Sequence, residues 1–512
     1  MQPIQILWVD DEVDLLKPHF LFLAARGYEV TASTNGQDAL EKVRTEHYDV
    51  VLLDENMPGL NGLETLQLLK VEFPGLPVIM VTKNEEEQIM EEAIGSKISD
   101  YLIKPVNPNQ ILLSLKKTLN HESLVSEKTN TNYLQEFQKI SLELLQIDNL
   151  NAWMELYKKL VFWQMELQTA GDNNLLEILD NQRKEANALF GKYVAKNYEH
   201  WINNDEVLFS NKLVKTKVIP ALQKPTLFLV IDNLRWDQWK TIAPTLEKHY
   251  RIEEELIYTS LLPTATQYAR NSLFAGMLPA QIKKTTPQWW KDDYEEGGKN
   301  LHEEALFRHQ LERLNVSGKI HYEKITQIKQ AKSFVNQLNK YKHYTVLTVV
   351  YNFVDMISHA KSEMEIIKEL ADNDQAYCAL TKTWFQNSPL LELIQQAQEK
   401  GFQLILTTDH GTINTQSPCE VIGDRESSLN LRYKTGKSLK VNSKKVMEIV
   451  HPEKIGLPSS GLSSSYIFAQ EAEYFVYPKN YHHFANLFLN TYQHGGISLE
   501  EMLIPFVILS PK

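Results

Sequence analysis

The stretch LFLVIDNLRW, residues 227–236, decides the fold of the larger part of this 512-residue chain. Its first five residues are apolar without interruption, which is typical of a parallel strand that is buried on both faces. Asp232 follows this run directly. Because ligands of parallel α/β sheets gather at the carboxyl ends of the strands, Asp232 is a candidate site residue. A second apolar run, residues 402–406, leads in the same way to Asp409 and His410.

Three further stretches carry residues with related chemistry. NFVDMISHA contains Asp355 and His359, whose spacing of four places both on one face of a helix. YQHGGIS contains His494, and LLPTATQYARNSLFAG contains Thr264 and Thr266. Together the five stretches supply carboxylates, imidazoles and hydroxyls, which are enough ligands for two divalent metal ions.

Taken in this order, the stretches resemble the motifs of the alkaline phosphatase superfamily. DNLRWDQW, PTATQYAR, TTDHG and HGGISLEEM are most similar to its PglZ branch, and the resemblance covers residues 225–505. Carboxylate and imidazole ligands suit zinc, with manganese as an alternative. The resemblance implies one metal ion on Asp355, His359 and His494, and a second on Asp232, Asp409 and His410.

The same resemblance implies a threonine nucleophile that is activated by a metal ion. The PT-x-T pattern of the phosphodiesterase branch indicates Thr266, which would then also contact zinc; Thr264 and Ser272 are the alternatives. Arg270 and Asn271 lie on the helix expected after Thr266. Since family members place phosphate at the amino end of this helix, we expect both residues to bind the phosphoryl oxygens of a substrate.

Residues 424–437, DRESSLNLRYKTGK, interleave basic side chains with a tyrosine. Such a loop can hold phosphate and stack a nucleobase. Trp236 and Tyr268 add further aromatic surface near the motifs, so a nucleotide or oligonucleotide is the predicted substrate class. The substrate-binding residues predicted in this loop are Arg425, Arg432, Tyr433 and Lys434.

Strands and helices alternate through residues 4–119 as five βα units. This pattern predicts a doubly wound parallel sheet. Polar residues close four of its strands, and they should converge at one edge of the sheet. They are Asp10 and Asp11, Asp54, Thr82, and Lys104.

This amino-terminal arrangement closely resembles a two-component receiver domain. The resemblance implies that Asp54 accepts a phosphoryl group and that Thr82 and Lys104 bind its oxygens. It also implies a cis peptide bond between Lys104 and Pro105. Mg²⁺ prefers hard oxygen ligands together with phosphate. Its implied ligands are Asp10, Asp11, Asp54 and the backbone carbonyl of Asn56.

Between these two regions, apolar residues recur at helical spacing with little strand signal. We therefore expect a receiver domain over residues 1–120, a helical connector over 121–217 and a PglZ domain over 218–512. The predicted fold class is α/β: a flavodoxin-like receiver domain, a helical-bundle connector and an alkaline-phosphatase-like α/β domain.

Composition excludes several classes of protein. The formal net charge of −12 argues against broad binding to duplex nucleic acid, which needs a basic surface. The two cysteines form no metal-spaced motif and suggest a reducing compartment. No signal-peptide pattern and no apolar stretch of membrane-spanning length is visible in the sequence. We therefore expect a cytoplasmic protein.

The domain order resembles PorX-like response regulators, a family that controls type IX secretion and gliding. That resemblance implies a cognate histidine kinase, a homodimer on phosphorylation, and a sigma factor or secretion component as a further partner. The predicted activity is that of a two-zinc phosphodiesterase. The alternative is an output module in which zinc is structural and which binds a transcription or secretion partner without catalysis.

Overall fold

The structure is a computed structural model of the chain, and it forms two compact units. The first contains residues 1–135 and 169–172, and the second contains residues 136–168 and 173–512. Within the helices, the side chains of residues 14, 116–117, 120–128 and 359–363 are not described. The residues that the structure describes are 4–83, 98–204, 206–363, 369–371, 373–423, 428, 430–441, 444–459 and 464–512.

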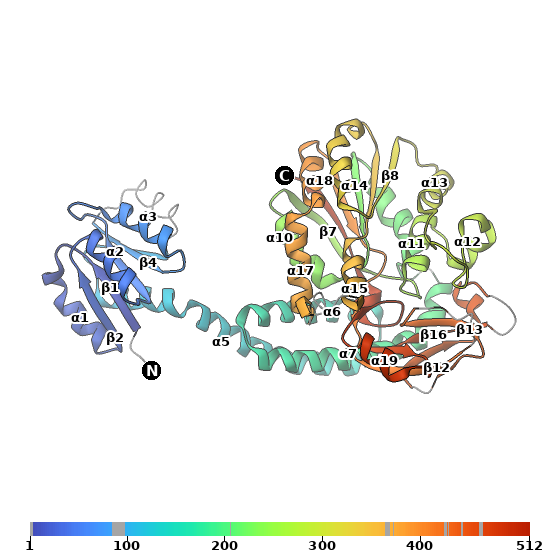
Figure 1. Cartoon of the computed structure of the whole chain (residues 1–512), viewed down its shortest axis with the longest axis horizontal. Coiled ribbons are helices and arrows are strands. Elements are labelled where there is room, and N and C mark those ends of the chain that lie inside the picture. The colour runs from blue at the N-terminus through green and yellow to red at the C-terminus, as the bar shows by residue number, and fades with distance from the viewer. Residues whose placement is uncertain are drawn as a thin grey trace. The chain divides into compact units, whose positions relative to one another are not determined.

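The amino-terminal unit is built on a five-stranded parallel sheet with the order β2-β1-β3-β4-β5 (Figure 1). Alternate residues of β3 enter two separate cores, Val51 and Leu53 on one face and Val50 and Leu52 on the other. The expected doubly wound sheet is therefore confirmed. Its strands are β1 (Ile4–Val9), β2 (Tyr28–Ser33), β3 (Val50–Asp54), β4 (Val78–Thr82) and β5 (Asp100–Ile103).

Helices α1 (Lys17–Ala24), α2 (Gly36–Thr45) and α3 (Gly62–Glu72) connect the first four strands. The helix expected after residue 84 lies outside the described residues. The last helix of this unit, α5 (Pro108–Gln146), runs without interruption for 39 residues. The predicted boundary after residue 120 therefore falls inside a helix.

Two more helices, α6 (Leu150–Ala170) and α7 (Asn173–Asn203), complete the connector. Trp153, Leu156 and Leu160 of α6 are each at most 2% exposed, as expected for the apolar side of an amphipathic helix. In the second unit, α7 packs against the carboxy-terminal part of the chain, where Asn187 contacts Glu500. None of the described helices is long and apolar enough to cross a membrane.

The second unit contains a six-stranded sheet with the order β7-β19-β10-β6-β9-β8. Strands β10, β6, β9 and β8 are parallel, and β19 is antiparallel to both of its neighbours. The apolar runs that the sequence indicated form β6 and β10, and both strands are fully buried. The strands are β6 (Thr226–Ile231), β7 (Tyr250–Thr259), β8 (Ile320–Ile325), β9 (Val346–Tyr351), β10 (Gln403–Thr407) and β19 (Leu503–Pro511).

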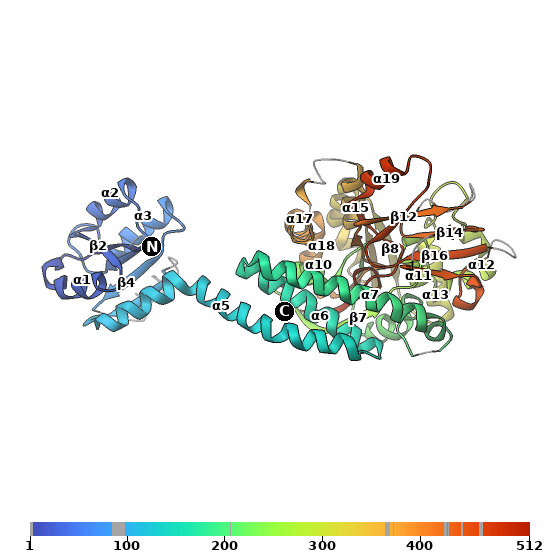
Figure 2. The same cartoon turned by 90° about the horizontal axis from the view of Figure 1, so that it is seen from below.

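Helices cover both faces of this sheet (Figures 1 and 2). On one face lie α10 (Trp236–Leu246), α17 (Asp374–Asn387) and α18 (Pro389–Glu399), and on the other lie α11 (Thr266–Ala275) and α13 (Glu303–Arg313). Phe228 of β6 contacts Phe274 of α11 and Phe307 of α13, so these two helices pack on the sheet.

A smaller β-rich part follows β10. One three-stranded sheet has the order β14-β12-β17, and another has the order β13-β16-β15. Their strands are β12 (Ser417–Ile422), β13 (Tyr433–Lys437), β14 (Lys440–Val441), β15 (Val446–Ile449), β16 (Ser464–Ala469) and β17 (Glu473–Val476). The chain then returns through α19 (Tyr481–Phe488) and α20 (Leu499–Met502) to β19.

Candidate metal centre

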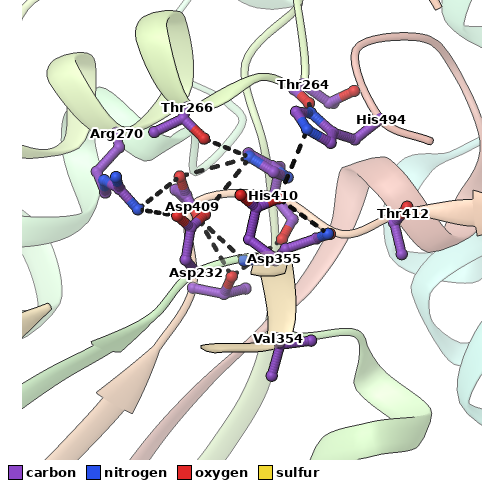
Figure 3. Close-up of polar contacts among 12 residues, drawn as sticks. Asp232, Thr264, Thr266, Arg270, Val354, Asp355, Asp409, His410, Thr412 and His494 are labelled. Carbon is purple, nitrogen blue, oxygen red and sulfur yellow. Dashed lines mark hydrogen bonds and ion pairs between the residues drawn. The ribbon is translucent and has the colours of Figure 1, made fainter. Parts of the chain in front are cut away.

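The carboxyl ends of β6 and β10 bring Asp232, Asp409 and His410 together (Figure 3). Asp232 is the first residue after β6, and its N–H donates to the carbonyl of Tyr351 at the end of β9. Ligand atoms of the three site residues lie within 4.8 Å of one another, and all three side chains are buried. The sequence motifs therefore meet at one place in the fold, although 177 positions separate Asp232 from Asp409.

The electrostatics of this cluster fit a cation. Burial raises the pKa of Asp232 and of Asp409 and lowers the pKa of His410, because each charged form loses its hydration. Oδ1 of Asp232 and Oδ2 of Asp409 are buried and accept no hydrogen bond in the described structure, and Oδ2 of Asp232 lies 2.6 Å from Arg270 Nη1 in an ion pair. Buried carboxylates in this state are stabilised by a paired charge or by a metal ion.

The histidine rings are oriented by backbone carbonyls. His410 Nδ1 lies 3.1 Å from the carbonyl of Gly411, and His494 Nδ1 lies 3.1 Å from the carbonyl of Thr264. Since a carbonyl accepts only from an N–H, each Nδ1 carries the proton and each Nε2 keeps its lone pair. Backbone contacts of this kind fix the tautomer and orientation of metal-ligating histidines.

The Nε2 atoms of both histidines face acidic partners. His410 Nε2 is 3.8 Å from Asp232 and 3.6 Å from Asp409, and His494 Nε2 is 3.7 Å from Asp355. The two rings stack with centroids 4.2 Å apart. Five of the six predicted ligands therefore gather in one pocket. The side chain of His359, on helix α15 (Phe353–Glu363), lies outside the described residues.

The two candidate threonines have different surroundings. Thr266 is the first residue of α11, and its Oγ1 lies 3.1 Å from His410 Nε2. Because that nitrogen is an acceptor, the Thr266 hydroxyl donates to it. Thr264 is fully buried; its hydroxyl donates to the carbonyl of Gly496 and accepts from the N–H of Gly495. Ser272 is also fully buried.

Arg270 and Asn271 both have partners within the protein. Arg270 is fully buried, with Nη1 2.6 Å from Asp232 Oδ2 and Nε donating to Glu303 at 2.6 Å. Asn271 is 1% exposed and donates to the carbonyl of Lys299. In this structure Arg270 is paired with carboxylates and Asn271 holds a loop, so both side chains already have protein partners. That they bind phosphoryl oxygens stays a prediction.

The loop prediction is corrected. Arg432 forms a two-point ion pair with Glu501 at 2.7 and 3.2 Å, and its side chain is fully buried. Tyr433 and Lys434 begin β13 and are 3% and 2% exposed. All three side chains are buried, so they do not form a clamp at the surface. Arg425 lies outside the described residues.

The receiver site forms a second acidic pocket in the amino-terminal unit. Asp10, Asp11 and Asp54 offer ligand atoms within 4.8 Å of one another. Lys104 Nζ lies 2.7 Å from Asp10 and 2.8 Å from Asp54, and the peptide bond to Pro105 is cis as expected. Burial raises the pKa of Asp54, although Lys104 opposes this shift.

The remaining receiver residues occupy the expected edge. Thr82 ends β4, and its hydroxyl donates to the Glu55 carboxylate. Asn56 is exposed, two residues beyond Asp54 at the end of β3. The acidic residues therefore lie at the edge of the sheet that the sequence indicated. A Mg²⁺ ion and a phosphoryl group would bind at this edge.

Two site residues were missed by the sequence analysis. Asn233, in the left-handed region with φ of 65°, donates from its side chain to Ser358 at 3.0 Å and from its backbone to Asp409 at 3.4 Å. Its place directly after Asp232 in the DNLRW motif was a usable signal. Glu303, the partner of Arg270, lies 33 residues away in a run of charged residues, where nothing in the sequence distinguishes it.

Models of known families match three parts of the chain. The family described as BREX system PglZ alkaline phosphatase-like domain matches residues 213–509. The PorX response regulator linker domain matches residues 123–202, and the response regulator receiver domain matches residues 6–116.

Curated relatives match only the receiver-sized part of the chain. The transcriptional regulatory protein ZraR of Klebsiella oxytoca is 37% identical over 123 residues, which are 24% of this chain and 28% of that protein. ResD of Bacillus subtilis is 30% identical over 142 residues, 27% of this chain and 59% of that protein. The chain thus spans less than two thirds of either relative.

Among solved structures, a CheY-like receiver domain from Methanospirillum hungatei has 29% identity and a TM-score of 0.23, covering 23% of this chain and 95% of that one.

Fold and site define a response regulator whose output domain is alkaline phosphatase-like. The output match covers more than half of the sequence, so the chain belongs to the PglZ family. With its receiver and linker matches, the whole chain has the PorX-like architecture.

Proposed function

We propose that the output domain is a zinc-dependent phosphodiesterase that acts on nucleotides or oligonucleotides. The observation that carries this proposal is the meeting of Asp232, Asp409 and His410 beside the Thr266 hydroxyl. Asp355 and His494 form the neighbouring half of the centre, and we infer that His359 completes it. Two divalent cations on these ligands would supply the positive charge that a phosphoryl-transfer transition state requires.

Thr266 is the residue of this chain that reacts with the substrate. Thr266 Oγ1 attacks the phosphorus in line with the leaving alkoxide, so an O–P bond forms as the opposite one breaks. The product is a phosphothreonine that still carries the second ester substituent, and the leaving alkoxide takes up the equivalent of the proton that Thr266 has lost. Water then hydrolyses the bond between Thr266 and phosphorus, which regenerates the hydroxyl. Thr266 Oγ1 lies 3.1 Å from His410 Nε2, the nitrogen that would hold zinc, so a bound zinc ion would be close enough to lower the pKa of the Thr266 hydroxyl.

A diester is favoured over a monoester by the way Arg270 is used. A dianionic monoester needs a cation to hold its additional charge, whereas a monoanionic diester does not. Arg270, the nearest arginine to Thr266 in the sequence, already pairs with Asp232 and Glu303. It is therefore not available to the substrate in this structure.

The test uses bis(p-nitrophenyl) phosphate and the full chain with added zinc. Thr266→Val should lower the rate by roughly 10³-fold or more, because the nucleophile is lost while the fold is kept. Thr383→Val is the matched control, since Thr383 is an exposed residue of α17 whose hydroxyl donates to a carbonyl of its own helix. Removing zinc with a chelator should abolish the wild-type rate, and adding it back should restore the activity.

Other outcomes have separate meanings. Equal rates for wild type and Thr266→Val would reject Thr266 as the nucleophile. If the zinc-loaded wild type shows no rate while zinc still raises its melting temperature, the output domain is a binding module with structural zinc.

For the whole chain, we infer a cognate histidine kinase that phosphorylates Asp54, and an output that serves type IX secretion and gliding, with a sigma factor or secretion component as partner. The PorX-type linker and the acidic receiver pocket support this inference. In the native host, Asp54→Asn should impair secretion of type IX cargo and colony spreading. Normal secretion and spreading in that strain would contradict it.

A further inference from the structure

The nucleoside part of a substrate needs a surface near the metal centre. The sequence offered Trp236, Tyr268 and Tyr433 for stacking, but these side chains are only 3%, 1% and 3% exposed. Tyr268 and Tyr433 both donate their hydroxyls to Asp293. They are held in the interior, so a base that enters this domain has to stack elsewhere.

A cavity of about 390 Å³ opens where β8 and β9 end. Its apolar wall consists of Ile325, Ile328, Tyr351, Phe353 and Met356. Ile328 is 56% exposed and Met356 is 50% exposed, although both are large apolar residues. An exposed apolar surface that lines a concave site is a common feature of ligand-binding pockets.

The cavity adjoins the metal centre along the chain and along the sheet. Asp355, a predicted metal ligand, lies between Phe353 and Met356 on the first turn of α15. Strand β9 pairs with β6, which ends at Asp232, and β8 is the next strand outward. The metal centre and the cavity therefore share the end of β9 and the first turn of α15.

The lining suits a flat aromatic ring with a polar edge. The ring of Phe353 stacks on Trp384 with centroids 3.8 Å apart and planes 6° from parallel, which fixes its orientation. Gln327 and Lys329 add an amide and a cation to the rim. Nucleobases stack on aromatic and apolar side chains while their edges form hydrogen bonds with polar groups.

We propose that the cavity between the end of β8 and the first turn of α15 binds a nucleobase of the substrate. The proposal rests on the phosphodiesterase function and defines its substrate class more closely. It assigns Ile328, Phe353 and Met356 to the recognition of the base, at a position beside Asp355. The bond cleaved and the nucleophile are unchanged.

The test compares two esters with the same leaving group. Thymidine 5′-(p-nitrophenyl phosphate) carries a nucleoside, and methyl p-nitrophenyl phosphate does not. In Ile328→Ser and in Met356→Ser, the ratio of kcat/KM for the thymidine ester to that for the methyl ester should fall about ten-fold. Ile422→Ser is the matched control, because Ile422 is 52% exposed on β12 and does not line the cavity; its ratio should equal that of wild type.

Each other result has a defined meaning. An unchanged ratio in both cavity variants would overturn the proposal. If wild type cleaves neither ester, the phosphodiesterase function fails, and calorimetric binding of AMP to the full chain then decides the subsite. Weaker AMP binding in Ile328→Ser than in Ile422→Ser would retain a base-binding cavity without that reaction. Equal binding in both, or none to wild type, would reject it and leave a hydrophobic partner segment as the occupant.

Discussion

Arg270 lies between two acids from distant parts of the chain, Asp232 and Glu303, at 2.6 Å from each. Glu303 also pairs with Lys324 and accepts from Tyr322, so it is anchored independently. We predict that Glu303→Gln weakens zinc binding about 10- to 100-fold. Without the charge of Glu303, Arg270 pairs more fully with Asp232 and competes with the metal ion for that carboxylate.

The measurement for Glu303→Gln is competition between the protein and a chromophoric zinc chelator, which does not depend on activity. Glu304→Gln provides the control, since Glu304 is the next residue, is exposed and pairs only with Arg308. Equal zinc affinity for wild type and Glu303→Gln would show that the Arg270 contact has no influence on the metal site.

Lys434 is a buried cation whose burial lowers its pKa to about 7, with Asp293 opposing the shift. Its ammonium donates to the carbonyl of Ser428 at 2.8 Å and lies 4.7 Å from the ring centre of Tyr477. Lys434 therefore binds its ammonium proton less tightly in the folded state than in the unfolded state. The free energy of unfolding should therefore rise with pH between about 7 and 10.5.

The variant Lys434→Met tests this dependence. Below pH 7 both states of the wild type are protonated, so the cost of burying the charge is present in full. The variant should be more stable than wild type at pH 7, on the order of 3 kcal/mol, and the difference should shrink by pH 10. Chemical denaturation at both pH values measures it, and a difference that does not change with pH would contradict the assignment to Lys434.

At the scale of elements, β6 and β10 could be predicted because strands buried on both faces need uninterrupted apolar runs. Their polar continuations, Asp232 and Asp409, could be placed because parallel strands end at one edge of a sheet. The receiver edge at Asp54 followed from the same rule. Local pattern was sufficient for these residues.

Local pattern was not sufficient where partners come from far along the chain. Arg432 and Lys434 had the composition of a surface loop, yet Arg432 is buried in an ion pair with Glu501 and Lys434 is buried in β13, which pairs with β16. Arg270 was interpreted as a phosphate ligand because Glu303 could not be recognised as its partner. The continuous helix α5 carries no sequence break where one domain was expected to end. In each case a long-range contact or a shared helix overrides the local signal.

Helix α7 is attached to the alkaline phosphatase-like part of the chain through a buried amide. Asn187 accepts from the N–H of Leu499 at 2.8 Å and donates to Glu500 at 3.0 Å, at the start of α20. Burial raises the pKa of Glu500, so its carboxyl depends on such donors. Asn187→Leu leaves one buried N–H and one buried carboxyl without their partner. We predict a loss of about 2–4 kcal/mol in the free energy of unfolding.

Urea unfolding of the full chain, followed by tryptophan fluorescence, measures this loss. Glu185→Gln is the control on the same helix, because Glu185 is exposed. A change below about 0.5 kcal/mol in Asn187→Leu, the range expected for surface substitutions, would mean that α7 is not held to α20 through this amide.

At the scale of the whole molecule, the chain joins an input site at Asp54 to an output site at Asp232. The compact units divide the connector, with α5 up to residue 135 in the first and α7 in the second. A signal from Asp54 therefore has to begin with a change in the first unit, and α5 continues from that unit into the second. One such change is the formation of a dimer. The described surface of the receiver domain exposes apolar residues that a dimer could bury.

We predict that phosphorylation of Asp54 produces a homodimer. In the amino-terminal unit, Leu113 at the start of α5 is 70% exposed and Ile103 at the end of β5 is 40% exposed. Apolar side chains at this exposure favour burial against a second copy. Beryllofluoride and Mg²⁺, which mimic the phosphorylated aspartate, should convert the protein from monomer to dimer at micromolar concentration in sedimentation velocity. Asp54→Asn, which lacks the carboxylate that binds beryllofluoride, should stay monomeric. A treated wild type that sediments as a monomer would remove dimerisation from the activation mechanism and leave conformational change within one chain.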